Sequence, residues 1–231
     1  MMKLIARLGA DIAGNVLVEV TVMMTLIFIF VLGGIDFLFA FYQYNAAAKA
    51  VERGARVAAV WAPVATGLNS LSTSALTNGC SGASCTAGGA MPYFKVTCDG
   101  SLATPACSCD SGYCSGLTYS ADALAAIVCG RGSTDTTACG NGTCPASTSL
   151  YTTGMCQILG NIRPSNVKVV YTQTGLGYAG RPGGPVPTIT VSLVNVPFIY
   201  YFLGGLLNFA NITMPPLTTS ITGEYMSSAA P

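Results

Sequence analysis

The sequence predicts an α+β protein: a long amino-terminal helix packs on a small antiparallel sheet, and a disulfide-rich insertion lies between them in the chain. Three observations lead to this prediction. A charge-free apolar stretch, Val20 to Ile35, continues into an alanine-rich segment. Ten cysteines lie between Cys80 and Cys156, and apolar and polar residues alternate in the segments after Val167.

The first expected element is one long helix. From Val16 to Tyr44 the chain is apolar over more than the roughly 20 residues that a bilayer span needs. Alanine, the best helix former, dominates after Tyr44, and Pro63 provides a stop. Glu52 and Arg56 form an i,i+4 pair that suits an exposed face. We therefore expect the first part of the helix in lipid and its last part in water.

Two carboxylates bracket the apolar stretch. Glu19 and Asp36 are seventeen positions apart, which is about 25 Å along a helix and close to the hydrocarbon thickness of a bilayer. In one interpretation both side chains lie near the two interfaces and reach water. In the other, Glu19 is buried against a neighbouring subunit, because an unpaired charge inside a span costs roughly 2.5–3.5 kcal/mol. Gly33 and Gly34 are expected to allow close packing of a neighbouring helix.

The cysteines indicate an oxidising compartment. Their number is even, their spacings are irregular, and the chain has no histidine, which favours disulfides over a metal site. Spacing alone does not give the connectivity. A disulfide-rich region belongs outside the cytoplasm, so we place the amino terminus inside, although the flanking charges alone lean the other way. The candidate disulfide residues are Cys80, Cys85, Cys98, Cys107, Cys109, Cys114, Cys129, Cys139, Cys144 and Cys156.

Composition argues against several classes of function. Charged residues make up 8% of the chain and the net charge is +1, so nucleic-acid binding, which needs clustered Lys and Arg, is not expected. The lack of histidine removes the commonest general base and metal ligand. Acidic residues at Asp99, Asp110, Asp122 and Asp135 are scattered. We expect no enzyme, no cofactor and no metal.

The last third of the chain has the pattern of half-buried strands. Val167–Gln173 and Thr188–Leu193 alternate with period two, and Leu217–Met226 is expected to form a third strand. Within the cysteine-rich region, Pro92–Thr97 is a candidate strand and Ala121–Val128 a candidate two-turn helix.

Residues 191–210 are uncharged and long enough to be counted as a second span. The stretch begins as a strand, contains Asn195 and Pro197, and is interrupted by Gly204-Gly205. We therefore expect an apolar loop, with Phe198–Leu203 docked on a partner subunit or on the membrane surface.

Several short motifs occur in a specific order in the first sixty residues. Gly14 is followed five residues later by Glu19, the apolar stretch ends in Asp36-Phe37, and Tyr44-Asn45 precedes the segment Ala50–Arg56. Together these motifs resemble the TadE/TadF-like minor pilins, or pseudopilins, of tight-adherence (Flp) type IV pili. The resemblance covers about the first sixty residues. Val20 stands where the family often has an aromatic residue, and the acid and base at Glu52-Arg53 are transposed.

The resemblance implies a processing site and a set of partners. A prepilin peptidase would cut between Gly14 and Asn15, which makes Glu19 the fifth residue of the mature chain. In such pilins this glutamate neutralises the amino terminus of a neighbouring subunit. The expected partners are other pilin subunits, the inner-membrane pilus assembly machinery, the peptidase and membrane lipid.

The implied location is the bacterial inner membrane, with a single pass, a periplasmic carboxy-terminal domain and incorporation into an extracellular pilus. The expected parts are a leader at 1–14, the helix at 15–61, a cysteine-rich insertion at 62–166 and a sheet region at 167–231.

Three functions compete. The first is a structural minor pilin that takes part in assembly or in tip and adhesive function. The second is a secreted disulfide-rich binding protein whose signal peptide is cut near Ala46–Ala48. The apolar region would be too long for an ordinary signal peptide, and it would contain the two acids Glu19 and Asp36. The third, a membrane-anchored enzyme, has no supporting constellation of residues.

Overall fold

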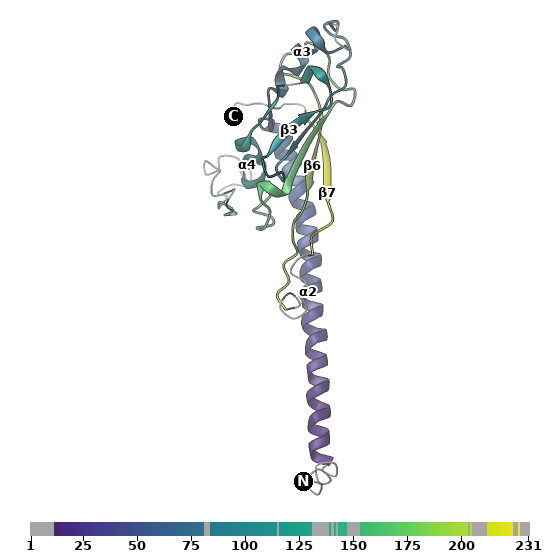
Figure 1. Cartoon of the computed structure of the whole chain (residues 1–231), viewed down its shortest axis with the longest axis vertical. Helices are drawn as coiled ribbons and strands as arrows, with labels where there is room; N and C mark the ends of the chain where they lie inside the picture. The colour runs from purple at the N-terminus through teal and green to yellow at the C-terminus, as the bar shows by residue number, and fades with distance from the viewer. Residues whose placement is uncertain are drawn as a thin grey trace. The chain divides into compact units, whose positions relative to one another are not determined.

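The chain forms two compact units, which are described separately. The first contains Met1–Gln43 and Pro197–Ile212, and the second contains Tyr44–Val196 and Thr213–Pro231. Figure 1 shows the computed structural model. It describes residues 12–80, 84–114, 116–130, 139, 141, 143–146, 153–202, 204, 212–223 and 226, with side chains from 16 onward.

The long amino-terminal helix predicted from the sequence is confirmed. Helix α2 runs over Ile12–Val60 (Figure 1). No proline interrupts it, and it ends just before Pro63. The hydroxyls of Thr21 and Thr25 donate to backbone carbonyls three or four residues earlier, both at 2.8 Å. These two polar side chains are therefore satisfied within the apolar helix itself.

The second unit is built on a five-stranded antiparallel sheet with the strand order β3-β2-β5-β6-β7. Burial alternates along β5 and β6, as the period-two pattern predicted. Val169 lies opposite Val191 in this register, so the apolar faces of the two strands coincide. The strands are β2 Lys95–Asp99, β3 Ala106–Cys109, β5 Val167–Thr172, β6 Thr188–Leu193 and β7 Leu217–Thr222.

The cysteine-rich region contributes two of these strands, whereas the sequence predicted a sheet of three. β2 overlaps the candidate strand Pro92–Thr97 and pairs with β5. β3 is an edge strand of small and sulfur-containing residues, which lacks the apolar alternation that identifies a strand in sequence. Cys98 on β2 lies directly opposite Cys107 on β3, and the two form a disulfide. This covalent bond holds the edge strand where its side chains provide little apolar burial.

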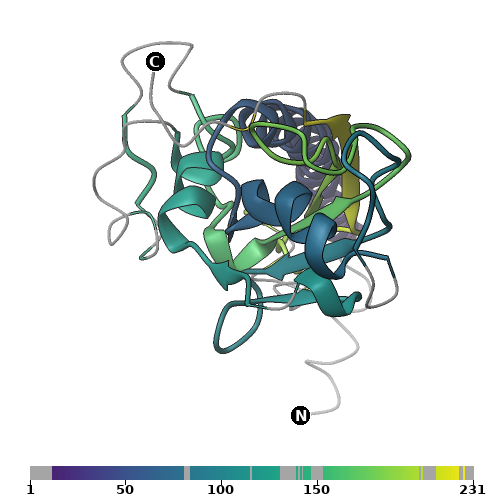
Figure 2. The same cartoon turned by 90° about the horizontal axis from the view of Figure 1, so that it is seen from above.

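Short elements complete the second unit. The predicted helix at Ala121–Val128 is confirmed as α4, and Ser120 caps it by accepting from Ala123 N at 3.2 Å. Figure 2 shows α3, α4 and the strands gathered around the end of α2. The remaining elements are β1 Ala65–Thr66, η1 Leu68–Ser70, α3 Leu71–Asn78, η2 Gly112–Cys114, β4 Thr118–Tyr119, α4 Ala121–Cys129 and η4 Pro164–Asn166.

All ten cysteines are paired in disulfides, as their even number predicted. Every bridge joins cysteines five to twelve residues apart in sequence. The bridges therefore stabilise local loops instead of joining distant segments. The pairs are Cys80–Cys85, Cys98–Cys107, Cys109–Cys114, Cys129–Cys139 and Cys144–Cys156.

The last turns of α2 form part of the core of the second unit. Ala47, Ala50 and Val51 are buried on this part of the helix. At Gly54, an added Cβ would lie 2.6 Å from the sulfur of Met155. Glycine at this position therefore allows a close approach that a larger residue would prevent.

Candidate functional site

The first part of α2 has an apolar surface on all sides. Every apolar side chain larger than alanine from Val16 to Val31 is exposed in the chain by itself. Among the described residues, one helix combines the length and apolar composition needed to cross a membrane. A helix that is apolar all round belongs in lipid or inside a protein assembly. The helix therefore fits membrane anchoring.

Glu19 lies on this apolar helix and its side chain is exposed. It makes no ion pair with any residue that the structure describes. Gly14 and Asn15 lie in the first turn of α2, while leader residues 1–11 lie outside the described part of the chain. Leader cleavage after Gly14 and the assembly role of Glu19 therefore stay predictions.

Asp36 is the one buried charged residue of the first unit's described part. Its carboxylate accepts hydrogen bonds from the backbone N–H groups of Tyr201 and Phe202, at 3.0 and 2.9 Å. The interpretation in which both carboxylates of the helix reach water is wrong for Asp36, whose exposed fraction is 0%. Its negative charge is offset by two backbone donors, an arrangement stronger than hydrogen bonds between neutral groups.

Gln43 holds the same loop at a second point. Its Oε1 accepts from the backbone N–H of Ile199 at 2.9 Å, and its Nε2 donates to the carbonyl of Ile199 at 2.8 Å. Between the two anchors, the ring centroids of Phe39 and Tyr201 lie 5.0 Å apart. Asp36, Phe39 and Gln43 have the spacing i, i+3, i+7, which places them on one face of a helix.

The apolar loop predicted within 191–210 is present as far as the structure describes it. Residues 203 and 205–211 lie outside the described part. Residues 197–202, called the 197–202 loop below, are held on α2 of the same chain through their backbone. Docking of the loop's side chains on a partner subunit or on the membrane surface stays a prediction. Sequence reasoning missed Gln43. A glutamine seven residues after an aspartate, among apolar neighbours, was the available signal.

Further along α2, the predicted pair of Glu52 and Arg56 is confirmed at 2.6 Å, and Lys49 joins it at 3.3 Å. The hydrogen bond and positive charge of Lys49, followed by those of Arg56, lower the pKa of Glu52. All three side chains are at least 40% exposed, so the cluster contributes little to stability and keeps this face of the helix polar.

The scattered acidic residues have structural surroundings. Asp99 and Asp110 lie 3.5 and 3.8 Å from two different lysines. Asp122 lies in the first turn of α4, where the helix dipole favours a negative charge. Asp135 lies outside the described residues. Two of the first three therefore lie in ion pairs with lysines, and the third lies at a helix start.

Comparison with protein families gives a match over most of this helix. Residues 14–56 match the family described as TadE-like protein. The amino-terminal helix is TadE-like. Comparison with curated proteins and with solved structures returned no match.

The TadE-like segment begins at Gly14 and ends at Arg56, within the last turns of α2. It contains Glu19, both anchors of the 197–202 loop and the exposed charge cluster around Glu52. The rest of the chain, including the sheet and the five disulfides, lies outside the matched segment.

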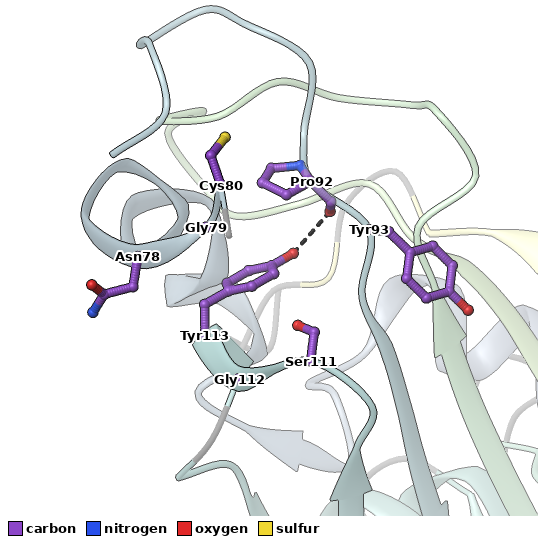
Figure 3. Close-up of a pocket in the computed structure, with 8 residues that line it drawn as sticks. All are labelled: Asn78, Gly79, Cys80, Pro92, Tyr93, Ser111, Gly112 and Tyr113. Carbon is purple, nitrogen blue, oxygen red and sulfur yellow. Dashed lines mark hydrogen bonds between the residues drawn. The ribbon is translucent and has the colours of Figure 1, made fainter. Parts of the chain in front are cut away.

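The second unit has a cleft of about 830 Å³ beside the Cys80–Cys85 disulfide (Figure 3). Tyr113 donates its hydroxyl to the carbonyl of Pro92 at 2.8 Å, and burial raises the pKa of this phenol to about 12. Tyr93 is exposed. The described residues that line the cleft carry no formal charge.

Proposed function

We propose that the protein is a minor pilin or pseudopilin that takes part in the assembly or tip function of a Tad-type pilus. In this proposal its leader is removed between Gly14 and Asn15. The observation that carries the proposal is the TadE-like match, which begins at Gly14 and covers a helix whose first part, Val16 to Val31, exposes its apolar surface on all sides. Lateral packing with other pilin helices would bury that surface.

In this proposal Glu19 fixes the axial position of one pilin helix against its neighbour. It is the one charged side chain between Val16 and Ile35, and an unpaired charge inside a membrane costs roughly 2.5–3.5 kcal/mol. After cleavage, the positive amino terminus of a neighbouring subunit would offset that cost. A subunit in another register would leave the carboxylate unpaired and would be penalised.

The alternative of a secreted binding protein fits the geometry less well. A signal-peptide cut after Ala48 would divide α2 twelve residues before its end. It would remove buried Ala47 together with Asp36 and Gln43, which bind the backbone of the 197–202 loop. The membrane-anchored pilin keeps all of these contacts.

The first test is the amino-terminal sequence of the mature protein from its native membrane fraction. We expect a start at Asn15, and Gly14→Leu should block processing because the peptidase requires a small residue at the cut. Gly34→Leu is a matched control, since an added Cβ there meets no atom within 4 Å, and it should be processed normally. A start near Lys49 would favour the secreted protein, and an intact Met1 would leave a plain anchor.

The second test separates processing from assembly. Glu19→Ala and Glu19→Gln should be cleaved normally but should enter pili at least about tenfold less than the unchanged chain, because the charge pair is lost. Asp110→Ala, which removes an exposed carboxylate from the second unit, is the control. Unchanged incorporation of both Glu19 variants, measured by immunoblot of sheared pili, would contradict the assembly role.

A further inference from the structure

Four backbone N–H groups of the 197–202 loop have hydrogen-bond partners within the protein itself. Gln43 binds both backbone groups of Ile199, and Asp36 accepts from the N–H groups of Tyr201 and Phe202. The N–H of Phe198 donates to the carbonyl of Ile212 at 2.9 Å. A loop in water has no need of such partners, because water supplies them. Backbone in irregular conformation at membrane depth requires them, because lipid supplies none.

The position of the anchors along α2 gives the depth of this loop. The stretch from Val16 to Ile35 contains twenty residues, which span about 30 Å as a helix and match the hydrocarbon thickness of a bilayer. Asp36 is the next residue, and Gln43 lies about 10 Å further along the helix. Both anchors therefore fall where hydrocarbon gives way to headgroups when the helix crosses a membrane.

Most of the large exposed side chains at this level are aromatic, although that of Ile199 is not. Those from α2 and from the 197–202 loop together form what we call the collar, and their exposed fractions lie between 43% and 72%. No charged residue occurs from 182 to 223. The collar continues the exposed apolar surface of the span. Its members are Phe37, Phe41, Tyr42, Ile199, Tyr201 and Phe202.

We propose that the collar inserts into the lipid interface of the leaflet on the carboxy-terminal side of the span. Tyrosine, which the collar contains at Tyr42 and Tyr201, favours this zone, where an apolar ring and a polar edge are both accommodated. Asp36 and Gln43 act as positioning residues that satisfy the loop backbone so that its side chains can enter lipid. The inference requires a membrane-spanning helix and does not depend on leader removal or pilus assembly.

Tryptophan fluorescence tests the collar directly. Trp61 is the one tryptophan of the chain, so Trp61→Phe with Tyr201→Trp places a single reporter in the collar. The full chain is reconstituted in phosphatidylcholine vesicles that contain lipids brominated either near the headgroup or deep in the acyl chain. We expect at least about twofold quenching, stronger with the shallow bromines than with the deep ones. The unsubstituted chain, in which Trp61 is the one tryptophan, is the control, and bromolipid should quench its fluorescence little.

Phe202→Trp in the Trp61→Phe background provides a second reporter, in case the Tyr201→Trp substitution itself alters the loop. Quenching of both reporters by shallow bromines supports the proposal. Reporters that bromolipid leaves unchanged and aqueous iodide quenches would overturn it. Reporters that are unaffected by bromolipid and become shielded only in assembled pili would assign the collar to a neighbouring subunit, which would also overturn it.

The anchors are tested in the same assay. Asp36→Ala with the Tyr201→Trp reporter should reduce bromolipid quenching by at least about half, because the freed backbone then favours water. Asp110→Ala in the same background should leave quenching unchanged. Equal quenching with and without Asp36 would overturn its positioning role.

Discussion

The substitution Asp36→Ala should release the 197–202 loop from α2 while leaving the helix intact. Alanine is a better helix former than aspartate, so the helix itself loses nothing at this position. The loop loses the acceptor of two backbone N–H groups, those of Tyr201 and Phe202. Gln43 still binds Ile199, so the loop keeps one of its two attachments.

The magnitude follows from the number and type of bonds. A hydrogen bond to a charged group contributes about 1.5–3 kcal/mol. Two such bonds at a fully buried carboxylate therefore give about 3 kcal/mol or more for loop docking. Since 1.4 kcal/mol corresponds to a factor of ten, the population of the open loop should rise about a hundredfold. Asp36→Asn keeps one acceptor oxygen, so its open-loop population should lie between those of the unchanged chain and of Asp36→Ala.

Hydrogen–deuterium exchange read by mass spectrometry measures this change in the full chain in nanodiscs. Peptides that contain Tyr201 and Phe202 should exchange about a hundredfold faster in Asp36→Ala. Peptides from β5 and β6 should be unchanged, and Asp110→Ala should leave the loop protected. Exchange of the loop within about threefold of the unchanged chain would refute the anchoring by Asp36.

Two further predictions concern the second unit. Tyr171→Phe removes the buried hydroxyl that accepts from Val64 N at 2.9 Å, and should lower the free energy of unfolding by about 1–3 kcal/mol in chemical denaturation; an unchanged midpoint would contradict it. At Asp99, burial raises the pKa but hydrogen bonds from Ser101 and the charge of a lysine outweigh it, so the pKa lies below 3.8. The unfolded chain therefore takes up the proton first, and stability should fall below about pH 4. Asp99→Asn should flatten this loss, and an unaltered acid profile would count against it.

Local pattern was enough to predict α2, α4, β5 and β6. The apolar and alanine-rich stretch without proline determined α2, because helix propensity and the cost of exposing backbone in lipid are properties of the segment itself. Alternation determined β5 and β6, because successive side chains of a strand point to opposite faces. The even count of cysteines predicted disulfides, although not the pairing.

Contacts between distant segments could not be predicted in this way. β2 and β3 joined the sheet through pairing with β5 and through the Cys98–Cys107 bridge, neither of which leaves a period in the sequence. The sheet region and the cysteine-rich region, expected as successive parts, therefore share one sheet.

The sequence by itself determined an apolar helix with an acid at each end. Only the tertiary structure gave the two acids different surroundings. Asp36 is buried beneath a loop that lies far along the sequence. Tyr201 and Phe202, which follow Asp36 by 165 and 166 positions, bring two backbone N–H groups to it. Glu19 stays exposed, with no partner among the described residues of its own chain. The physical reason is that a carboxylate takes its properties from the donors around it, and those donors come from a segment that no local pattern connects to the helix.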